Sequence, residues 1–152
     1  MPLVTSTALR SGEVPRRCYD ECRTRDRGMN GVRYELMSQG KILVLTTGPR
    51  FTTDDLLDTM RSAFGDPAVR RPLKLLLDNR GSKESASSTE VQRRAALLGS
   101  LTHLLLPHMA VVVSDDLHYG LARMGAAYVE ESGFSVAVFR DFDEARVWLE
   151  AL

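Results

Sequence analysis

Long apolar runs are missing from this chain of 152 residues, and none approaches the ~18 residues that a transmembrane helix needs. An excess of one charge is missing as well, because 20 basic residues balance 20 acidic residues. A neutral chain is not expected to bind nucleic acid or an anionic membrane through a broad basic surface. No basic start followed by an apolar stretch marks a secretory signal, so we expect a cytoplasmic protein without a membrane span.

Cysteine and histidine are scarce, with two and three residues. Cys18 and Cys22 have the spacing CxxxC, whereas zinc and redox sites use CxxC together with further ligands. His103, His108 and His118 do not form an HExxH pattern. We therefore expect no metal and no cofactor, and a domain of this length buries enough surface to fold without either.

Motifs for nucleotide binding and for hydrolysis are absent too. Gly81-Ser82-Lys83 resembles the end of a phosphate-binding loop, but that loop has the pattern GxxxxGK[ST], and Leu76 stands where its first glycine belongs. GxGxxG and GxSxG do not occur, so dinucleotide binding and α/β-hydrolase chemistry lose their usual sequence support. We therefore predict no catalytic residue and no enzyme activity.

Residues 1–30 differ in composition from the rest of the chain. They contain six Arg and four acidic residues together with Gly, Pro and Ser, and they show no sustained apolar period. Such a segment buries too little surface to offset the entropy of ordering it. We therefore expect residues 1–30 to be a flexible N-terminal arm and residues 31–152 to form a single domain.

Five segments have the patterns of β-strands. Alternating apolar and polar residues over 32–37 indicate a half-buried strand, and a Ser-Gln-Gly turn joins it to the next segment, which predicts a hairpin. Segments 73–77 and 109–113 are almost wholly apolar, as in strands buried on both faces of a parallel sheet. The predicted strands are 32–37, 41–46, 73–77, 109–113 and 134–139.

Helical patterns separate these strands. The first predicted helix is capped by Thr52 or Thr53, with acidic residues in its first turn. A Ser-rich loop, 82–88, leads into a second, long helix whose apolar face extends through Leu105, with Pro107 just past its end. Two more helices follow the last two strands.

The order of elements predicts the fold class. Ser114 and Asp141 are expected to cap the last two helices, which gives the order β-β-α-β-α-β-α-β-α. This order predicts an α/β fold in one domain, with a mixed, mainly parallel sheet and the first strand antiparallel at an edge. Only Arg33 and Glu35 protect that edge, and unpaired edges favour pairing, so we predict a homodimer.

Polar residues gather where the predicted strands end. Ligands of open α/β sheets bind beyond the carboxyl ends of the strands, so this set is the candidate partner or ligand surface. Helix caps and turns also demand polar residues there, which is the alternative explanation. The set comprises Thr46, Thr47, Asp78, Asn79, Arg80, Ser114, Asp115, Arg140 and Asp141.

Three stretches of the chain resemble a known family. They are KILVLTTG, PLKLLLDNRG and the C-terminal stretch from MAVVVSDDLHYGLARMG through VFRDFDEARVWLEAL. Together with the element order, they resemble the STAS domain (sulfate transporter and anti-sigma factor antagonist), and most closely its SpoIIAA-like branch of small bacterial proteins. The resemblance covers residues 32–152 and implies a mixed sheet with helices and a role in protein–protein regulation without catalysis.

The resemblance also implies a candidate phosphorylation switch. In anti-sigma antagonists, a Ser in the loop that opens the second helix is phosphorylated, after an Asp that ends the preceding strand. Asp78 matches that Asp, and Ser87 falls on or near the phosphorylated Ser, with Ser88 beside it. Ala86 stands where the family has a second Asp, and Ser88-Thr89 stands where its Gly is expected.

Two hypotheses of function follow. The first is a regulatory module that engages an unidentified protein partner through loop 78–90 and the start of the following helix. Its predicted partner surface comprises Asp78, Asn79, Arg80, Lys83, Thr89 and Arg93. The alternative is a small apolar-ligand or lipid-binding protein with a pocket between sheet and helices. The predicted lining comprises Leu56, Met60, Leu101 and Met124, whose helical spacing is also explained by core packing.

Overall fold

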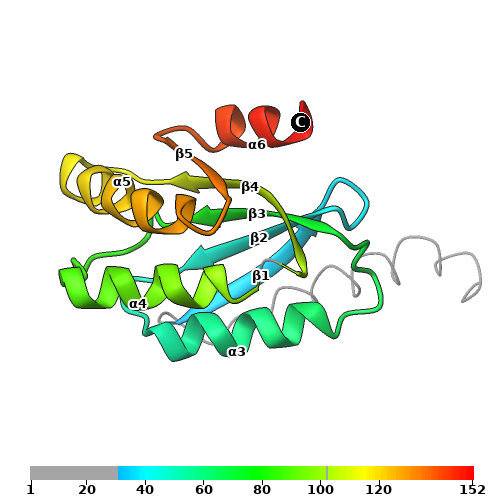
Figure 1. The fold of residues 1–152 in the computed structure, drawn as a ribbon, viewed down its shortest axis with the longest axis horizontal. Coiled ribbons are helices and arrows are strands. Elements are labelled where there is room, and N and C mark those ends of the chain that lie inside the picture. The colour runs from blue at the N-terminus through cyan, green and yellow to red at the C-terminus, as the bar shows by residue number, and fades with distance from the viewer. Residues whose placement is uncertain (1–30, 102) are drawn as a thin grey trace, which may run out of the picture.

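A five-stranded sheet in the order β1-β2-β3-β4-β5 forms the centre of the protein (Figure 1). The computed structural model describes residues 31–101 and 103–152, so the arm predicted over 1–30, with Cys18 and Cys22, lies outside the described residues. The strands are β1 (Val32–Met37), β2 (Ile42–Thr47), β3 (Leu73–Asp78), β4 (Leu105–Val112) and β5 (Ser135–Phe139). The helices are α3 (Thr53–Phe64), α4 (Ser88–Gly99), α5 (Asp116–Glu130) and α6 (Phe142–Glu150).

The predicted order of elements and the mixed, mainly parallel sheet are confirmed. β1 pairs with β2 in antiparallel orientation at one edge, and every later pair of neighbours is parallel. Because neighbouring parallel strands follow each other along the chain, right-handed crossovers place all the connecting helices on the same face of the sheet. Figure 1 shows α3, α4 and α5 on that face and α6 on the other.

Side chains that alternate along the strands divide the core between these two faces. Leu43, Leu75 and Val111 belong to the larger cluster, which α3, α4 and α5 cover. Val44 and Leu76 point to the opposite face and pack in a smaller cluster with α6. All five are buried, which explains why the central strands read as continuous apolar runs.

The hairpin turn between β1 and β2 depends on one glycine. Ser38, Gln39 and Gly40 all have positive φ, at 53°, 60° and 84°. A Cβ on Gly40 would lie 2.1 Å from the carbonyl oxygen of Ala68, so a larger residue cannot fit without moving the backbone. The turn predicted from Ser-Gln-Gly therefore has a specific packing requirement.

The second predicted helix is shorter than expected. α4 ends at Gly99, and Leu105 and Pro107 lie in β4, which begins at Leu105 instead of Met109. The pairing of β4 with β3 shifts register between Leu105 and Met109. Pro107 has no backbone N–H to donate, and the irregular stretch of the ladder accommodates it there.

Every helix in the described residues starts at the carboxyl end of the preceding strand, on a polar N-cap. In each case the cap side chain accepts a hydrogen bond from the backbone N–H of the third helical residue. Ser114, the predicted cap of α5, instead donates to the carbonyl oxygen of Arg80, and Asp115 takes the cap position. The N-caps are Thr52, Ser87, Asp115 and Asp141.

The C-terminus is tied to the middle of the sheet. Lys74 of β3 donates from Nζ to the carbonyl oxygens of Leu149 and Leu152, at 2.6 and 2.7 Å. Leu149 belongs to the last turn of α6 and Leu152 follows the helix, so this ammonium group binds the carbonyl-rich end of α6. Ser38 in the hairpin turn donates to the carboxylate of Glu150 at 2.7 Å.

Candidate functional site

A small cavity lies between α4, α5 and the sheet, beneath the loop that joins β3 to α4. Its volume is about 100 Å³, and most of its lining is apolar. The cavity is lined by small residues on the two facing helices, which approach closely, because a Cβ on Gly125 would lie 3.3 Å from the side chain of Val91. These small lining residues are Ala95 on α4 and Ala122, Gly125 and Ala126 on α5.

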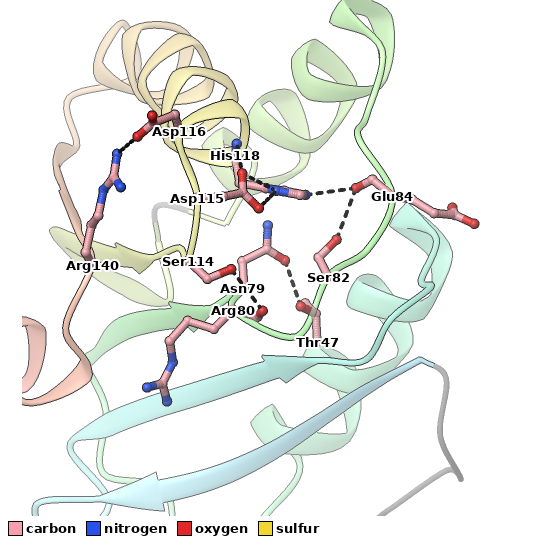
Figure 2. Close-up of polar contacts among 10 residues, drawn as sticks. All are labelled: Thr47, Asn79, Arg80, Ser82, Glu84, Ser114, Asp115, Asp116, His118 and Arg140. Atoms are coloured by element: carbon pink, nitrogen blue, oxygen red, sulfur yellow. Dashed lines mark hydrogen bonds and ion pairs between the residues drawn. The ribbon is translucent and has the colours of Figure 1, made fainter.

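Polar groups surround the cavity at the carboxyl end of the sheet. Thr47 donates from Oγ1 to Oδ1 of Asn79 at 2.7 Å, which orients the Asn79 amide. The Nδ2 group points away from Thr47, as Figure 2 shows, and has no hydrogen-bond acceptor among residues 31–101 and 103–152. Asn79 lines the cavity, so this amide offers a donor at its polar end.

His118 holds the β3–α4 loop against α5. Its imidazole is 8% exposed, with Nδ1 at 2.8 Å from Oδ2 of Asp115 and Nε2 at 3.1 Å from the carbonyl oxygen of Glu84. Ser82 donates from Oγ to the same carbonyl oxygen, also at 3.1 Å. Because Glu84 belongs to the loop and His118 to α5, these bonds fix the loop beside the cavity (Figure 2).

The environment of Asp115 favours its ionised form. The backbone N–H of His118 lowers the pKa of the Asp115 carboxyl below its usual value, and the imidazole of His118 adds to the effect. The same carboxylate caps α5, where a negative charge interacts favourably with the helix dipole. Asp115 therefore has two roles: it orients the His118 imidazole and it caps α5.

Ser82, His118 and Asp115 are the residue types of a hydrolase triad, but their geometry differs from one. The hydroxyl of Ser82 and Nε2 of His118 both meet the carbonyl oxygen of Glu84, and the described residues contain no hydrogen bond between hydroxyl and imidazole. Because Nε2 faces this carbonyl oxygen and not the hydroxyl, the imidazole is not placed as a base for Ser82. The arrangement braces the loop.

A polar groove of about 460 Å³ lies beside the apolar cavity, between the starts of α3 and α4. Arg94 connects α4 to α3 there, because it donates from Nε to Oγ1 of Thr53 at 3.2 Å and its guanidinium lies 4.4 Å from the ring centre of Phe51. Thr53 donates in turn to Glu90. Burial lowers the pKa of Arg94, and the charge of Glu90 partly offsets this effect.

The apolar cavity and the polar groove are neighbours and share part of their lining. The residues common to both are Ser82, Glu84, Ala86 and Arg94. Loop 82–86 and the Arg94 side chain therefore lie between the apolar cavity and the polar groove.

Both residues of the predicted phosphorylation switch are exposed. Ser87 is the N-cap of α4 and accepts from the backbone N–H of Glu90 at 3.2 Å, and Ser88 is the first residue of the helix. Ser87 lines the polar groove together with Arg93 and Arg94, whereas Ser88 does not.

The predicted partner surface is divided by the fold. Asp78 is buried, and its carboxylate accepts from Nε and Nη2 of Arg80, which raises the pKa of that guanidinium. Arg80 lies over the ring of Phe142 in α6, whereas Arg93 pairs with Asp54 in α3, so the two arginines contact opposite faces of the sheet. Lys83 and Thr89 are exposed on the loop and at the start of α4, and Asn79 lines the cavity.

The remaining strand-end residues meet beside α5. Arg140 pairs with Asp116 at the first turn of α5 and lies 5.1 Å from the ring centre of Tyr119. Ser114 bonds to the backbone of Arg80, so the ends of β3, β4 and β5 are joined (Figure 2). Asp141 caps α6. The sequence correctly predicted that these residues gather at one edge.

The apolar lining predicted for a ligand pocket is wrong in detail. Leu56, Met60, Leu101 and Met124 are absent from the lining of the apolar cavity. Leu56 and Met60 are buried core residues of α3, which packs against β1 and β2, while the cavity lies between α4 and α5.

His118 is the site residue that sequence reasoning missed. The sequence pattern assigns His118 to no site and favours Ser114 as the cap of α5. With Asp115 as the cap, His118 becomes the third helical residue and faces back to the cap side chain. The Asp-x-x-His spacing was the available indication, since it follows the geometry of a capping box.

No three His, Cys, Asp or Glu side chains within residues 31–101 and 103–152 are grouped closely enough to hold a metal ion. Over the same residues, no helix combines the length and apolar character that membrane crossing requires. No protein-family model matches the chain, and no curated protein or solved structure matches it.

Proposed function

We propose that this protein is a non-enzymatic binding module that holds a small apolar group in the cavity between α4, α5 and the sheet. The cavity itself carries the proposal. It is lined by apolar side chains and lies at the carboxyl end of parallel strands, where α/β proteins bind their ligands. The polar groups of Asn79, Ser82 and His118 meet at one end of it.

The cavity volume limits the size of the ligand. Engineered apolar cavities of ~150 Å³ stay dry and bind benzene or xenon. A cavity of about 100 Å³ fits an apolar group somewhat smaller than benzene, such as a short branched alkyl chain. A whole lipid tail is too large, so a larger molecule has to extend into the adjacent groove.

Nuclear magnetic resonance of methyl groups tests this proposal. Xenon and benzene are added, and the methyl signals of Val91, Leu121 and Val129, which line the cavity, are expected to shift in a saturable manner. Ala122→Leu fills the cavity and abolishes these shifts, whereas Ala127→Leu, at an exposed position on the same helix, preserves them. Unchanged cavity methyls at saturating xenon and benzene contradict the proposal.

A second candidate function is regulation of a protein partner through loop 78–90, in the manner that the STAS resemblance implies. Its support is the exposure of Lys83, Ser87, Ser88 and Thr89, in the loop beside the cavity and at the start of α4. A partner that contacts this loop would sense whether the cavity below it is occupied.

Affinity capture from the native host tests the second candidate. A specific partner is expected to be recovered with the wild type and lost with Lys83→Glu or Ser87→Asp. Glu35→Lys, an exposed change on β1, is the control and is expected to retain the partner. Equal recovery with all variants contradicts docking through this loop.

A further inference from the structure

The position of Arg94 indicates the chemistry of the ligand's polar end. Arg94 extends from the middle of α4 and lines both the apolar cavity and the polar groove. A molecule whose apolar part occupies the cavity and whose polar part continues into the groove therefore passes the guanidinium of Arg94.

The guanidinium of Arg94 has N–H donors that no acceptor in the described part of the chain uses. Of its five N–H donors, one on Nε is used in the bond to Thr53, and this guanidinium makes no other hydrogen bond within residues 31–101 and 103–152. The nearest carboxylate oxygen, on Glu90, lies 3.9 Å from Nε, which is too long for a hydrogen bond. The side chain is only 22% exposed, so water compensates this charge incompletely.

The acidic residues that line the groove already have cationic partners. Glu84 pairs with Arg50 at 3.2 Å, and Asp54 pairs with Arg93 at 3.7 Å. Glu90 lies between two arginines, 3.9 Å from Arg94 and 4.0 Å from Arg93. Arg94 therefore shares the charge of Glu90 with Arg93, and an anion that approaches this pair of arginines meets two cations for one carboxylate. On the cavity side, the Nδ2 group of Asn79 adds a neutral donor suited to an oxygen acceptor.

We propose that the ligand is a small monocarboxylic acid, with a compact alkyl body in the apolar cavity and its carboxylate on the Nη groups of Arg94. The inference rests on the proposed function, because it assigns the head group of the molecule whose apolar part that cavity holds. A guanidinium binds a carboxylate through two parallel N–H···O bonds, which gives selectivity over an alcohol of the same shape. An amine is disfavoured because it brings a second positive charge to Arg94.

The test compares three molecules with the same body: 3-methylbutanoate, 3-methylbutan-1-ol and 3-methylbutan-1-amine. Binding to the full chain is measured at neutral pH from the shifts of the cavity methyl groups. The acid is expected to bind about tenfold or more tighter than the alcohol, as one charge-assisted pair provides. The amine is expected to bind weakest.

Variants separate a binding role of Arg94 from a structural one. Arg94→Gln is expected to lower the affinity for the acid to that for the alcohol, and to leave the affinity for the alcohol unchanged. Arg93→Gln is the matched control, because Arg93 lines the groove but not the cavity, and it is expected to retain the preference for the acid. If Arg94→Gln unfolds, Arg94→Lys keeps the charge but loses the planar guanidinium, and a reduced preference for the acid is expected.

The outcomes distinguish this inference from the proposed function. Equal binding of acid and alcohol, or an acid preference that survives Arg94→Gln, overturns the carboxylate assignment and leaves the apolar cavity in place. Absence of binding by all three molecules, together with no response to xenon, overturns both. If Arg94→Gln changes the thermal stability but not the ratio of the affinities for acid and alcohol, Arg94 only holds α4 against α3, and the carboxylate assignment is wrong.

Discussion

Removal of the His118 side chain is expected to loosen the β3–α4 loop more than it destabilises the whole fold. In His118→Ala, the bond from Nε2 to the carbonyl oxygen of Glu84 is lost, and such a bond contributes about 0.5–1.5 kcal/mol. Ser82 still donates to that oxygen, so the carbonyl is not left without a partner. Asp115 keeps its bond from the backbone N–H of residue 118 and remains half in water. We therefore expect the free energy of unfolding to fall by about 1–2 kcal/mol.

Hydrogen exchange and urea denaturation measure the two effects separately. The backbone N–H of Lys83 donates to the carbonyl oxygen of Pro49 at 2.9 Å, so its exchange reports whether the loop is seated. In His118→Ala this amide is expected to exchange faster, by a larger factor than amides of β3. His103→Ala, at an exposed position in the turn before β4, is expected to change neither quantity. Unchanged exchange at Lys83 in His118→Ala would refute the role of His118 as a brace.

Three further predictions concern stability and assembly. Because the folded state lowers the pKa of Asp115, the stabilisation from its ionised carboxylate is present at neutral pH and is lost as the pH falls through that lowered pKa. In urea titrations, the free energy of unfolding of Asp115→Asn should therefore fall less steeply with decreasing pH than that of the wild type, and identical slopes would contradict this. Gly40→Ala should lower the melting temperature, owing to the contact with Ala68, whereas Gly120→Ala in α5, with open space around it, should raise it by an amount equivalent to about 1 kcal/mol. Light scattering should give twice the monomer mass through pairing of β1 edges, and a mass of 16.9 kDa at high concentration would exclude the dimer.

The fold was largely predictable because its local patterns agree with each other. The apolar strand segments, the N-caps Thr52 and Asp141 and the hairpin turn are each encoded by a few neighbouring residues. The end of α4 was not predictable in this way, because the apolar spacing continues through Leu105. Pairing of Leu105 with Leu73, distant in sequence, places it in a strand instead.

The candidate site was only partly predictable for a similar reason. Strand ends could be located, so Asn79, Arg80 and Asp115 were placed at the correct edge. The cavity depends on which faces of α4 and α5 meet, and periodicity alone does not say that Ala95 and Gly125 line the same space. His118 required the correct cap residue of α5, which two adjacent candidates, Ser114 and Asp115, left open in the sequence.

Because strand order follows chain order, this sheet can grow in the direction of synthesis. Each new strand joins the edge left by the one before it, and each connecting helix covers the same face, so an emerging chain can bury its larger core stepwise. The second face differs, because Val44 and Leu76 pack in the cluster that α6, the last helix, completes. Lys74 can donate to the carbonyl oxygens of Leu149 and Leu152 only after α6 has packed, so the face of the sheet that α6 covers is completed after the larger core.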